Sequence, residues 1–300
     1  MRIDYGKELT HIAFDTASEV CAAKPDPRNA EASRGLVDRV KNGTLSWIGC
    51  EGENFFDYIR YGWPDGHRDM MKLAVEHQNI VAPLANVPRK RLLRDRQGQE
   101  YDIHTANFGR FDKAWTRRMR SNKQRPPRVC VAIEIAANAC MTNKDMFGGP
   151  AMGLLLADAL VRSRMQVMIL AIGCSEGSFE SLKTQHVCLS STVMKQYTEH
   201  INTLKLSGLC LSGWFRYHGF NAKYCTKYRV VPHVGYTLYR KRSYDNDKNE
   251  QWQRIEDCLL EYHKTDRLIF VPHRPTDHVS EDLRAAVQKI SASNSNVLTV

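Results

Sequence analysis

The sequence lacks the cysteine spacings from which disulfide frameworks and zinc sites are built. Its nine cysteines are an odd number, and the two closest, Cys130 and Cys140, are ten residues apart, so the chain has no C-x-x-C pair. Cys130 lies between Val129 and Val131, and apolar neighbours of this kind are typical of small buried thiols. We therefore expect reduced cysteines in the core.

Long hydrophobic runs and a leader sequence are also missing. Charged residues such as Glu134, Asp158 and Arg162 interrupt the most apolar stretch, residues 129–172, so no segment could span a membrane. Residues 1–20 contain four acids and no apolar core, which argues against a signal peptide. With 42% hydrophobic and 25% charged residues, the composition is that of a soluble globular protein, and we expect a cytoplasmic one.

No motif of a common enzyme class is present. The chain has no G-x-G-x-x-G, Walker A lysine, G-x-S-x-G or H-E-x-x-H. Cys174 follows an expected strand, but no histidine is linked to it by spacing. His273, Asp277 and His278 follow another expected strand and could ligate a metal ion. The sequence offers no second group of ligands at a known spacing, so we interpret these residues as a polar loop. We expect no enzyme, no catalytic residue, no metal and no cofactor.

What the sequence does have is concentrated positive charge. Its formal net charge is +10, but residues 89–128 contain thirteen Lys/Arg against four acids, and residues 214–244 contain seven Lys/Arg and no acid. The rest of the chain is mildly acidic. Two basic regions on an acidic body favour a polyanionic partner, most often nucleic acid, although solvated surface loops are an alternative.

The second basic region also interleaves aromatic residues with its cations. Unpaired bases stack on aromatic rings while cations follow the phosphates, a combination suited to single strands. Trp214, Tyr217 and Phe220 recur at three-residue spacing and could instead form one buried helix stripe. The residues that we expect to bind nucleic acid are Arg117, Arg118, Arg120, Lys123 and Arg125 in the first region, and Tyr236, Tyr239, Arg240, Lys241, Arg242 and Tyr244 in the second.

The hydrophobic pattern predicts an α/β fold. Apolar, β-branched runs at 129–136, 166–172 and 267–271 alternate with amphipathic segments, which is typical of an open, mostly parallel sheet with helices on both faces. Before it, residues 6–22 show helical spacing of apolar side chains. We therefore predict a helical N-terminal region (1–100), a basic connector (101–127), an α/β domain (128–292) and a loose tail (293–300).

Several segments resemble a known family. Three consecutive segments of this chain are the apolar strand at 129–136, the helix ending in Ala157-Asp158-Ala159-Leu160-Val161, and the strand from Gln166. Together they resemble the von Willebrand factor A-type domain. The turn Tyr61–Gly66 and the stretch Trp214–Tyr217 are similar to those of a group of tailed-phage proteins with a degenerate domain of that type. The resemblance implies a sheet of the von Willebrand A kind. Metal-binding members carry Asp-x-Ser-x-Ser after the first strand, where this chain has Glu134, Ala136 and Asn138, so we expect no Mg²⁺ site.

In size and charge the chain also resembles the single-stranded-DNA-binding transcription cofactors of short-tailed phages that encode their own RNA polymerase. This resemblance implies an accessory protein that holds melted promoter DNA and recruits or activates a phage RNA polymerase in the host cell cytoplasm. The alternative is a non-enzymatic protein–protein interaction module. A nuclease would need a cluster of carboxylates near the cations, and the sequence offers none.

Overall fold

The structure is a computed structural model of the 300-residue chain. It describes residues 1–43, 50, 52–85, 93–95, 100–101, 115–117, 126–135, 143–177, 179–183, 185–230, 236–237, 246–273, 276–292 and 297–299. Residues 1–85 and 127–300 form one compact unit, and residues 86–126 form a second.

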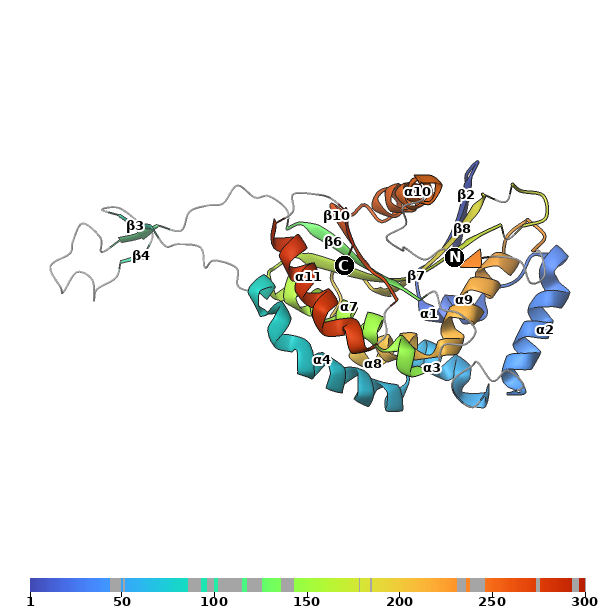
Figure 1. The fold of residues 1–300 in the computed structure, drawn as a ribbon, viewed down its shortest axis with the longest axis horizontal. Helices are drawn as coiled ribbons and strands as arrows, with labels where there is room; N and C mark the ends of the chain where they lie inside the picture. Colours follow the sequence, from blue (N-terminus) through green and yellow to red (C-terminus); the bar gives the residue numbers. More distant parts are fainter. Residues whose placement is uncertain are drawn as a thin grey trace. The chain divides into compact units, whose positions relative to one another are not determined.

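A mixed β-sheet forms the centre of the first unit (Figure 1). In spatial order its strands are β1 (Arg2–Tyr5), β2 (Leu9–Phe14), β8 (Val187–Lys195), β7 (Gln166–Glu176), β6 (Arg128–Glu134), β10 (Arg267–Val271) and β11 (Val297–Thr299). A short strand, β9 (Tyr236–Thr237), pairs antiparallel with the end of β7. The pairs β1–β2 and β7–β8 are antiparallel, whereas β2–β8, β7–β6, β6–β10 and β10–β11 are parallel.

The three strands predicted from unbroken apolar runs lie side by side and parallel, as expected. In β6, every residue from Val129 to Glu134 is buried, and the middle of β7 is buried throughout. Strands covered on both faces have no side that faces solvent. Their sequences are therefore continuously apolar and do not alternate between apolar and polar residues. The predicted α/β class is confirmed, with a mixed rather than mostly parallel sheet.

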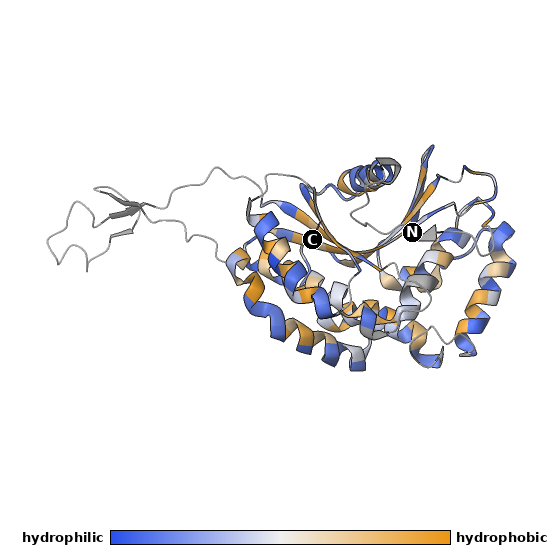
Figure 2. Cartoon of the chain, viewed as in Figure 1, coloured by the Kyte–Doolittle hydropathy of each residue, from blue (hydrophilic) through white to orange (hydrophobic). Residues whose placement is uncertain are grey.

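Helices cover both faces of this sheet unequally. The helices are α1 (Ala17–Ala22), α2 (Ala30–Lys41), α3 (Phe55–Tyr61), α4 (Pro64–Ala85), α6 (Asn143–Met146), α7 (Gly148–Arg162), α8 (Thr203–Ser207), α9 (Ser212–Tyr224), α10 (Asn246–Tyr262) and α11 (Val279–Ala292). Helix α10 lies on one face, over a small core that includes Leu170, Trp252 and Phe270. The larger core on the other face joins α7, α4, α9 and α11 to the sheet. In Figure 2 the hydrophobic sides of the helices are turned toward the sheet.

A glycine sets how closely α7 approaches β6. A Cβ atom at Gly153 would lie 2.5 Å from Cδ1 of Ile133 and 2.7 Å from its Cγ1, closer than real carbon contacts. The missing side chain therefore allows the helix to lie directly on the central strand.

The helices predicted near the N-terminus are present, from α1 to α4, but the first part of this region differs from the prediction. The segment expected as one helix from Gly6 to Ala22 contains instead the turn and second strand of the β1–β2 hairpin, followed by α1, whose first turn is capped by the Thr16 hydroxyl. Strand β2 is buried on both faces and pairs with β8, a partner so distant in sequence that local spacing could not reveal it.

The predicted domain boundaries also differ from the structure. Residues 1–85 share one unit with residues 127–300, so positions 1–100 are not a separate helical region. The unit that replaces the predicted connector spans 86–126 and contains a small sheet of β3 (Leu93–Asp95), β5 (Trp115–Arg117) and β4 (Glu100–Tyr101). In the predicted loose tail, β11 pairs with β10 and extends the main sheet.

Candidate nucleic-acid interface

The predicted binding residues fall in two separate units. Arg117 belongs to β5 of the small sheet, and Tyr236 belongs to β9 at the end of β7. The remaining predicted residues lie outside the part of the chain that the structure describes: Arg118, Arg120, Lys123, Arg125, Tyr239, Arg240, Lys241, Arg242 and Tyr244.

Part of the second basic region belongs to the core. Trp214 is 1% exposed and Tyr217 is 2% exposed on the inner side of α9, so the three-residue spacing of these rings reflects a buried helix stripe. Lys223 is buried on the same helix, with its ammonium 5.4 Å from the Phe220 ring centre. Burial lowers the pKa of Lys223, because the charged form loses its hydration. None of these three is available to a ligand.

Directly after α9, the chain brings cations and rings together at the surface. Lys227 is exposed, and its ammonium lies 4.3 Å from the ring centre of Tyr5 and 5.5 Å from that of Tyr228. The two tyrosine rings meet edge to face, with centres 5.4 Å apart. In addition, the backbone N–H of Lys227 donates to the Tyr5 hydroxyl at 2.9 Å. A residue at the end of β1 thus becomes the neighbour of a loop more than two hundred positions away.

Two further arginines complete this group. The guanidinium of Arg28 donates to the carbonyl oxygen of Lys227, and Arg229 follows Tyr228 in the same loop. We call Tyr5, Arg28, Lys227, Tyr228 and Arg229 the hairpin–loop surface. Both arginines are well exposed and face one acid each: Arg28 Nε lies 3.7 Å from Asp26, and Arg229 Nη1 lies 3.7 Å from Glu180. Such exposed, long pairs are weak, so an anionic ligand can compete for the guanidinium groups.

A buried asparagine holds the loop in place. The Asn29 side chain is 3% exposed and donates to the carbonyl oxygens of Tyr224, Thr226 and Tyr228 at 3.4, 3.2 and 2.8 Å. Its Oδ1 accepts from the N–H of Val230 at 3.2 Å. One side chain therefore satisfies backbone groups along the whole loop, and the surface is preformed.

Histidine side chains also contact serine hydroxyls inside the protein, where a substrate cannot reach them. His218, which is fully buried, hydrogen-bonds through Nδ1 with Ser190 at 3.2 Å and through Nε2 with Thr192 at 2.7 Å. On the other face, His11 Nε2 lies 2.8 Å from the Ser191 hydroxyl. Burial lowers the pKa of His11 and of His218 to about 3. A nucleophilic serine must be reachable by its substrate, so these pairs are structural.

At the end of β6, where the sequence predicts no Mg²⁺ site, one candidate ligand is described. Glu134 is 3% exposed, and its Oε2 accepts from the N–H of His273 at 3.3 Å. Ala136 and Asn138, the other two positions of the motif, lie outside the described residues. Among the residues that the structure places, no three His, Cys, Asp or Glu side chains form a group able to hold a metal ion.

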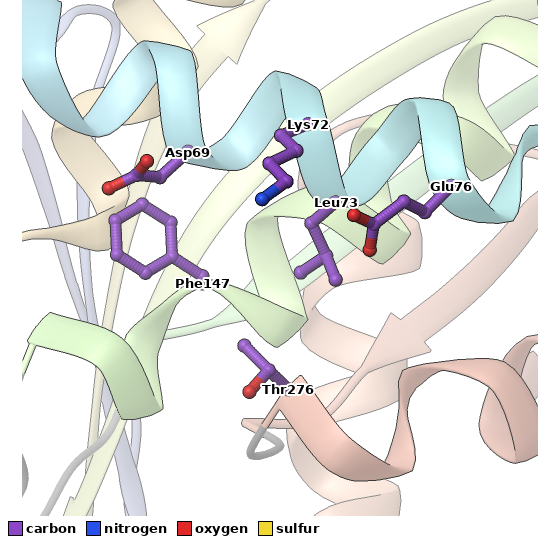
Figure 3. Close-up of a pocket in the computed structure, with 6 residues that line it drawn as sticks. All are labelled: Asp69, Lys72, Leu73, Glu76, Phe147 and Thr276. Carbon is purple, nitrogen blue, oxygen red and sulfur yellow. The ribbon is translucent and has the colours of Figure 1, made fainter.

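A cavity of about 290 Å³ opens elsewhere, along α4 (Figure 3). Asp69, Lys72, Leu73 and Glu76 of α4 line it together with Phe147 and Thr276. Two carboxylates against one ammonium give the lining a net negative charge, which disfavours a phosphate-bearing ligand. The charge of this lining therefore does not suit a nucleic acid.

The comparisons with known proteins give a family of unknown function. Residues 9–288 match a family described as Domain of unknown function (DUF7192), a match that runs from β2 into α11. No curated protein and no solved structure matches the chain. No helix in the described part of the chain has the length and apolar character needed to cross a membrane.

Proposed function

The chain belongs to the DUF7192 family, and we propose that it is a non-enzymatic protein that binds single-stranded DNA. The observation that supports this proposal is the exposed residue Lys227, whose ammonium lies 4.3 Å from the ring centre of Tyr5 and 5.5 Å from that of Tyr228. The predicted residues Tyr236 to Tyr244 follow this loop directly in the chain and add three consecutive cations.

The arrangement favours a single strand over a duplex for a physical reason. Cations alone serve a duplex, whose bases are already stacked and whose phosphates dominate non-specific affinity. Unpaired bases gain in addition from aromatic rings, by about 1–3 kcal/mol per base. A surface that combines Lys227, Arg28 and Arg229 with two tyrosines offers both contributions to a single strand.

We further propose, from the sequence resemblance, that the sheet is of the von Willebrand A kind and that the protein recruits or activates a phage RNA polymerase at melted promoter DNA in the host cytoplasm. The parallel trio β7–β6–β10, with α7 connecting β6 to β7, supports the first point. The polymerase is proposed by resemblance alone.

The test uses paired variants of the full chain and a fluorescent oligo-dT strand. Lys227→Ala removes a phosphate contact and is expected to weaken binding and to reduce the slope of log affinity against log salt by about 0.7. Tyr5→Leu removes a stacking ring and is expected to weaken binding with the slope unchanged. Lys72→Ala, which removes an exposed lysine from α4, is the matched control and should leave both quantities unchanged.

The same experiment can reject the proposal. If Lys227→Ala and Lys72→Ala alter binding equally, the hairpin–loop surface is not the interface. If the wild-type protein binds no nucleic acid, the chain is better described as a protein–protein interaction module.

A further inference from the structure

The cavity along α4 is bordered by the segments that follow two neighbouring strands. Strands β6 and β10 pair in parallel, with Ile133 opposite Val271 near their carboxyl ends. From these ends the chain leaves in opposite directions, because β6 continues through α7 to β7 and β10 continues through α11 to β11, on the two outer sides of the pair. The cavity lining includes Phe147, directly before α7, and Thr276, shortly before α11. Open α/β sheets commonly bind ligands at such a point.

One side of α4 forms a wall of this cavity. Asp69, Lys72, Leu73 and Glu76 line it, and their spacing of i, i+3, i+4 and i+7 places them on one side of the helix. The three charged residues are exposed, and Leu73 is half-buried. On the inner side of the same helix, Met70 is fully buried in the core. Packing therefore fixes the wall, and its charged side chains remain accessible.

Phe147 gives the cavity an apolar wall. Its side chain is 6% exposed, and its ring stacks on that of Trp63, with centres 5.9 Å apart and planes inclined by 29°. Figure 3 shows the Leu73 side chain directed toward the same hollow from α4. Apolar side chains of this kind contact the body of a small ligand, and an aromatic ring also attracts a cation.

The charged groups of the described lining favour a cation. Two carboxylates, those of Asp69 and Glu76, stand against the single ammonium of Lys72, and neither carboxylate forms an ion pair with a residue that the structure describes. In Figure 3 the Lys72 ammonium points from α4 toward the same hollow. Because Lys72 is exposed and long, it can turn toward solvent. The ammonium of a ligand could then take its place and be attracted by both carboxylates.

We infer that this cavity binds a small organic cation, in which a protonated amine is carried on a short apolar or aromatic group. The ammonium lies near Asp69 and Glu76 and donates a hydrogen bond to the Thr276 hydroxyl, while the apolar group contacts Leu73 and Phe147. Lys72 competes with the ligand and lowers its affinity. The inference does not depend on the proposed function, since the ligand is opposite in charge to a nucleic acid.

The test compares two probes of matched shape with the full chain, by NMR titration at low ionic strength. Phenethylammonium carries an ammonium on a phenylethyl group, and 3-phenylpropionate carries a carboxylate on the same group. We expect saturable binding of phenethylammonium and at least about tenfold weaker binding of 3-phenylpropionate. Salt screens exposed charges, so the preference for the cation should shrink as the ionic strength rises.

Two substitutions on α4 should change the affinity for phenethylammonium in opposite directions. Asp69→Asn removes a charge at nearly constant size and should weaken binding by about two- to fivefold, the range for exposed charge pairs. Lys72→Ala removes the competing ammonium and should strengthen binding by a similar factor. Asp38→Asn, which neutralises an exposed carboxylate on α2 outside the cavity lining, is the matched control. All three positions are exposed, so each variant should fold.

Three outcomes overturn the inference while leaving the proposed function intact. They are equal or no binding of the two probes by the wild-type protein, equal effects of Asp69→Asn and Asp38→Asn, and weaker binding after Lys72→Ala. Conversely, a protein that binds phenethylammonium as expected but binds no single-stranded DNA would support the cavity's ligand and refute only the proposed function.

Discussion

The side-chain amide of Asn29 donates a hydrogen bond to the carbonyl oxygen of Tyr228 at 2.8 Å. Asn29 stands at the start of α2, and Tyr228 belongs to the loop that follows α9. This contact, with those to Tyr224, Thr226 and Val230, gives Lys227 and Arg229 a fixed backbone from which their side chains reach the surface.

Replacing Asn29 should therefore affect both stability and binding. We expect Asn29→Ala to lower the free energy of unfolding by about 1–3 kcal/mol, because buried carbonyl groups lose their donor, and to weaken binding of oligo-dT. Asn42→Ala, at the exposed opposite end of α2, is the control and should change neither. Urea denaturation and fluorescence anisotropy measure the two effects, and equal stability of the two variants would contradict this role of Asn29.

The turn Tyr61–Gly66 depends on a glycine. Gly62 has φ of +103°, and a Cβ atom there would lie 2.0 Å from the carbonyl oxygen of Leu204. We expect Gly62→Ala to destabilise the protein by at least about 2 kcal/mol through backbone strain and this collision.

Gly35 provides the matched control within a helix. A Cβ atom at Gly35 meets nothing within 4 Å, so Gly35→Ala should stabilise the protein by up to about 1 kcal/mol through helix propensity. Thermal denaturation should shift in opposite directions for the two variants. A shift in the same direction would show that Gly62 is not constrained as the structure indicates.

Buried histidines should make stability depend on pH. The pKa of His11 and of His218 is lowered to about 3, and that of His263 to about 4, chiefly by burial. Below about pH 6.5 the unfolded chain binds protons that the folded chain does not, so the free energy of unfolding should fall steadily on acidification.

The interval from about pH 6.5 to about pH 5 isolates this effect, because carboxyl groups stay largely ionised there. Urea denaturation across that interval should give a free energy of unfolding that rises with pH. A flat profile would mean that these histidines are accessible or charged in the folded protein.

The segment from Arg240 to Arg242 yields a prediction made from the sequence. Arg240→Ala combined with Lys241→Ala should weaken single-strand binding and flatten its dependence on salt, since each phosphate contact contributes about 0.7 to the slope. Tyr239→Ala should weaken binding with the slope nearly unchanged, because stacking releases no counterions. If only the double cation variant has an effect, Tyr239 does not stack on a base.

The sequence could predict those parts of the fold whose signals are local. Strands β6, β7 and β10 are continuous apolar runs, and such runs report burial on both faces wherever they occur. Strand β2 is also buried on both faces, but its six residues include the polar Thr10 and His11, and it pairs with β8, about 180 positions later. No sequence pattern near Leu9 indicates that β8 is the partner strand.

The candidate interface also depends on contacts that local sequence patterns do not indicate. Trp214 and Lys227 belong to one basic and aromatic region, yet Trp214 is buried on the inner side of α9 and Lys227 is exposed in the loop that follows this helix. Tyr5 and Arg28 could not be foreseen at all, because no pattern near the N-terminus links them to residues 224–230. Their relation to Lys227 exists only in the folded chain.

The measurement that tests the central claim most directly is a salt titration of binding to matched single-stranded and duplex oligonucleotides by fluorescence anisotropy. The account predicts tighter binding of the single strand at every salt concentration, and an advantage that persists at high salt because stacking is not screened. Equal affinities for the two forms, converging to no binding as salt rises, would show a general polyanion binder and contradict the account.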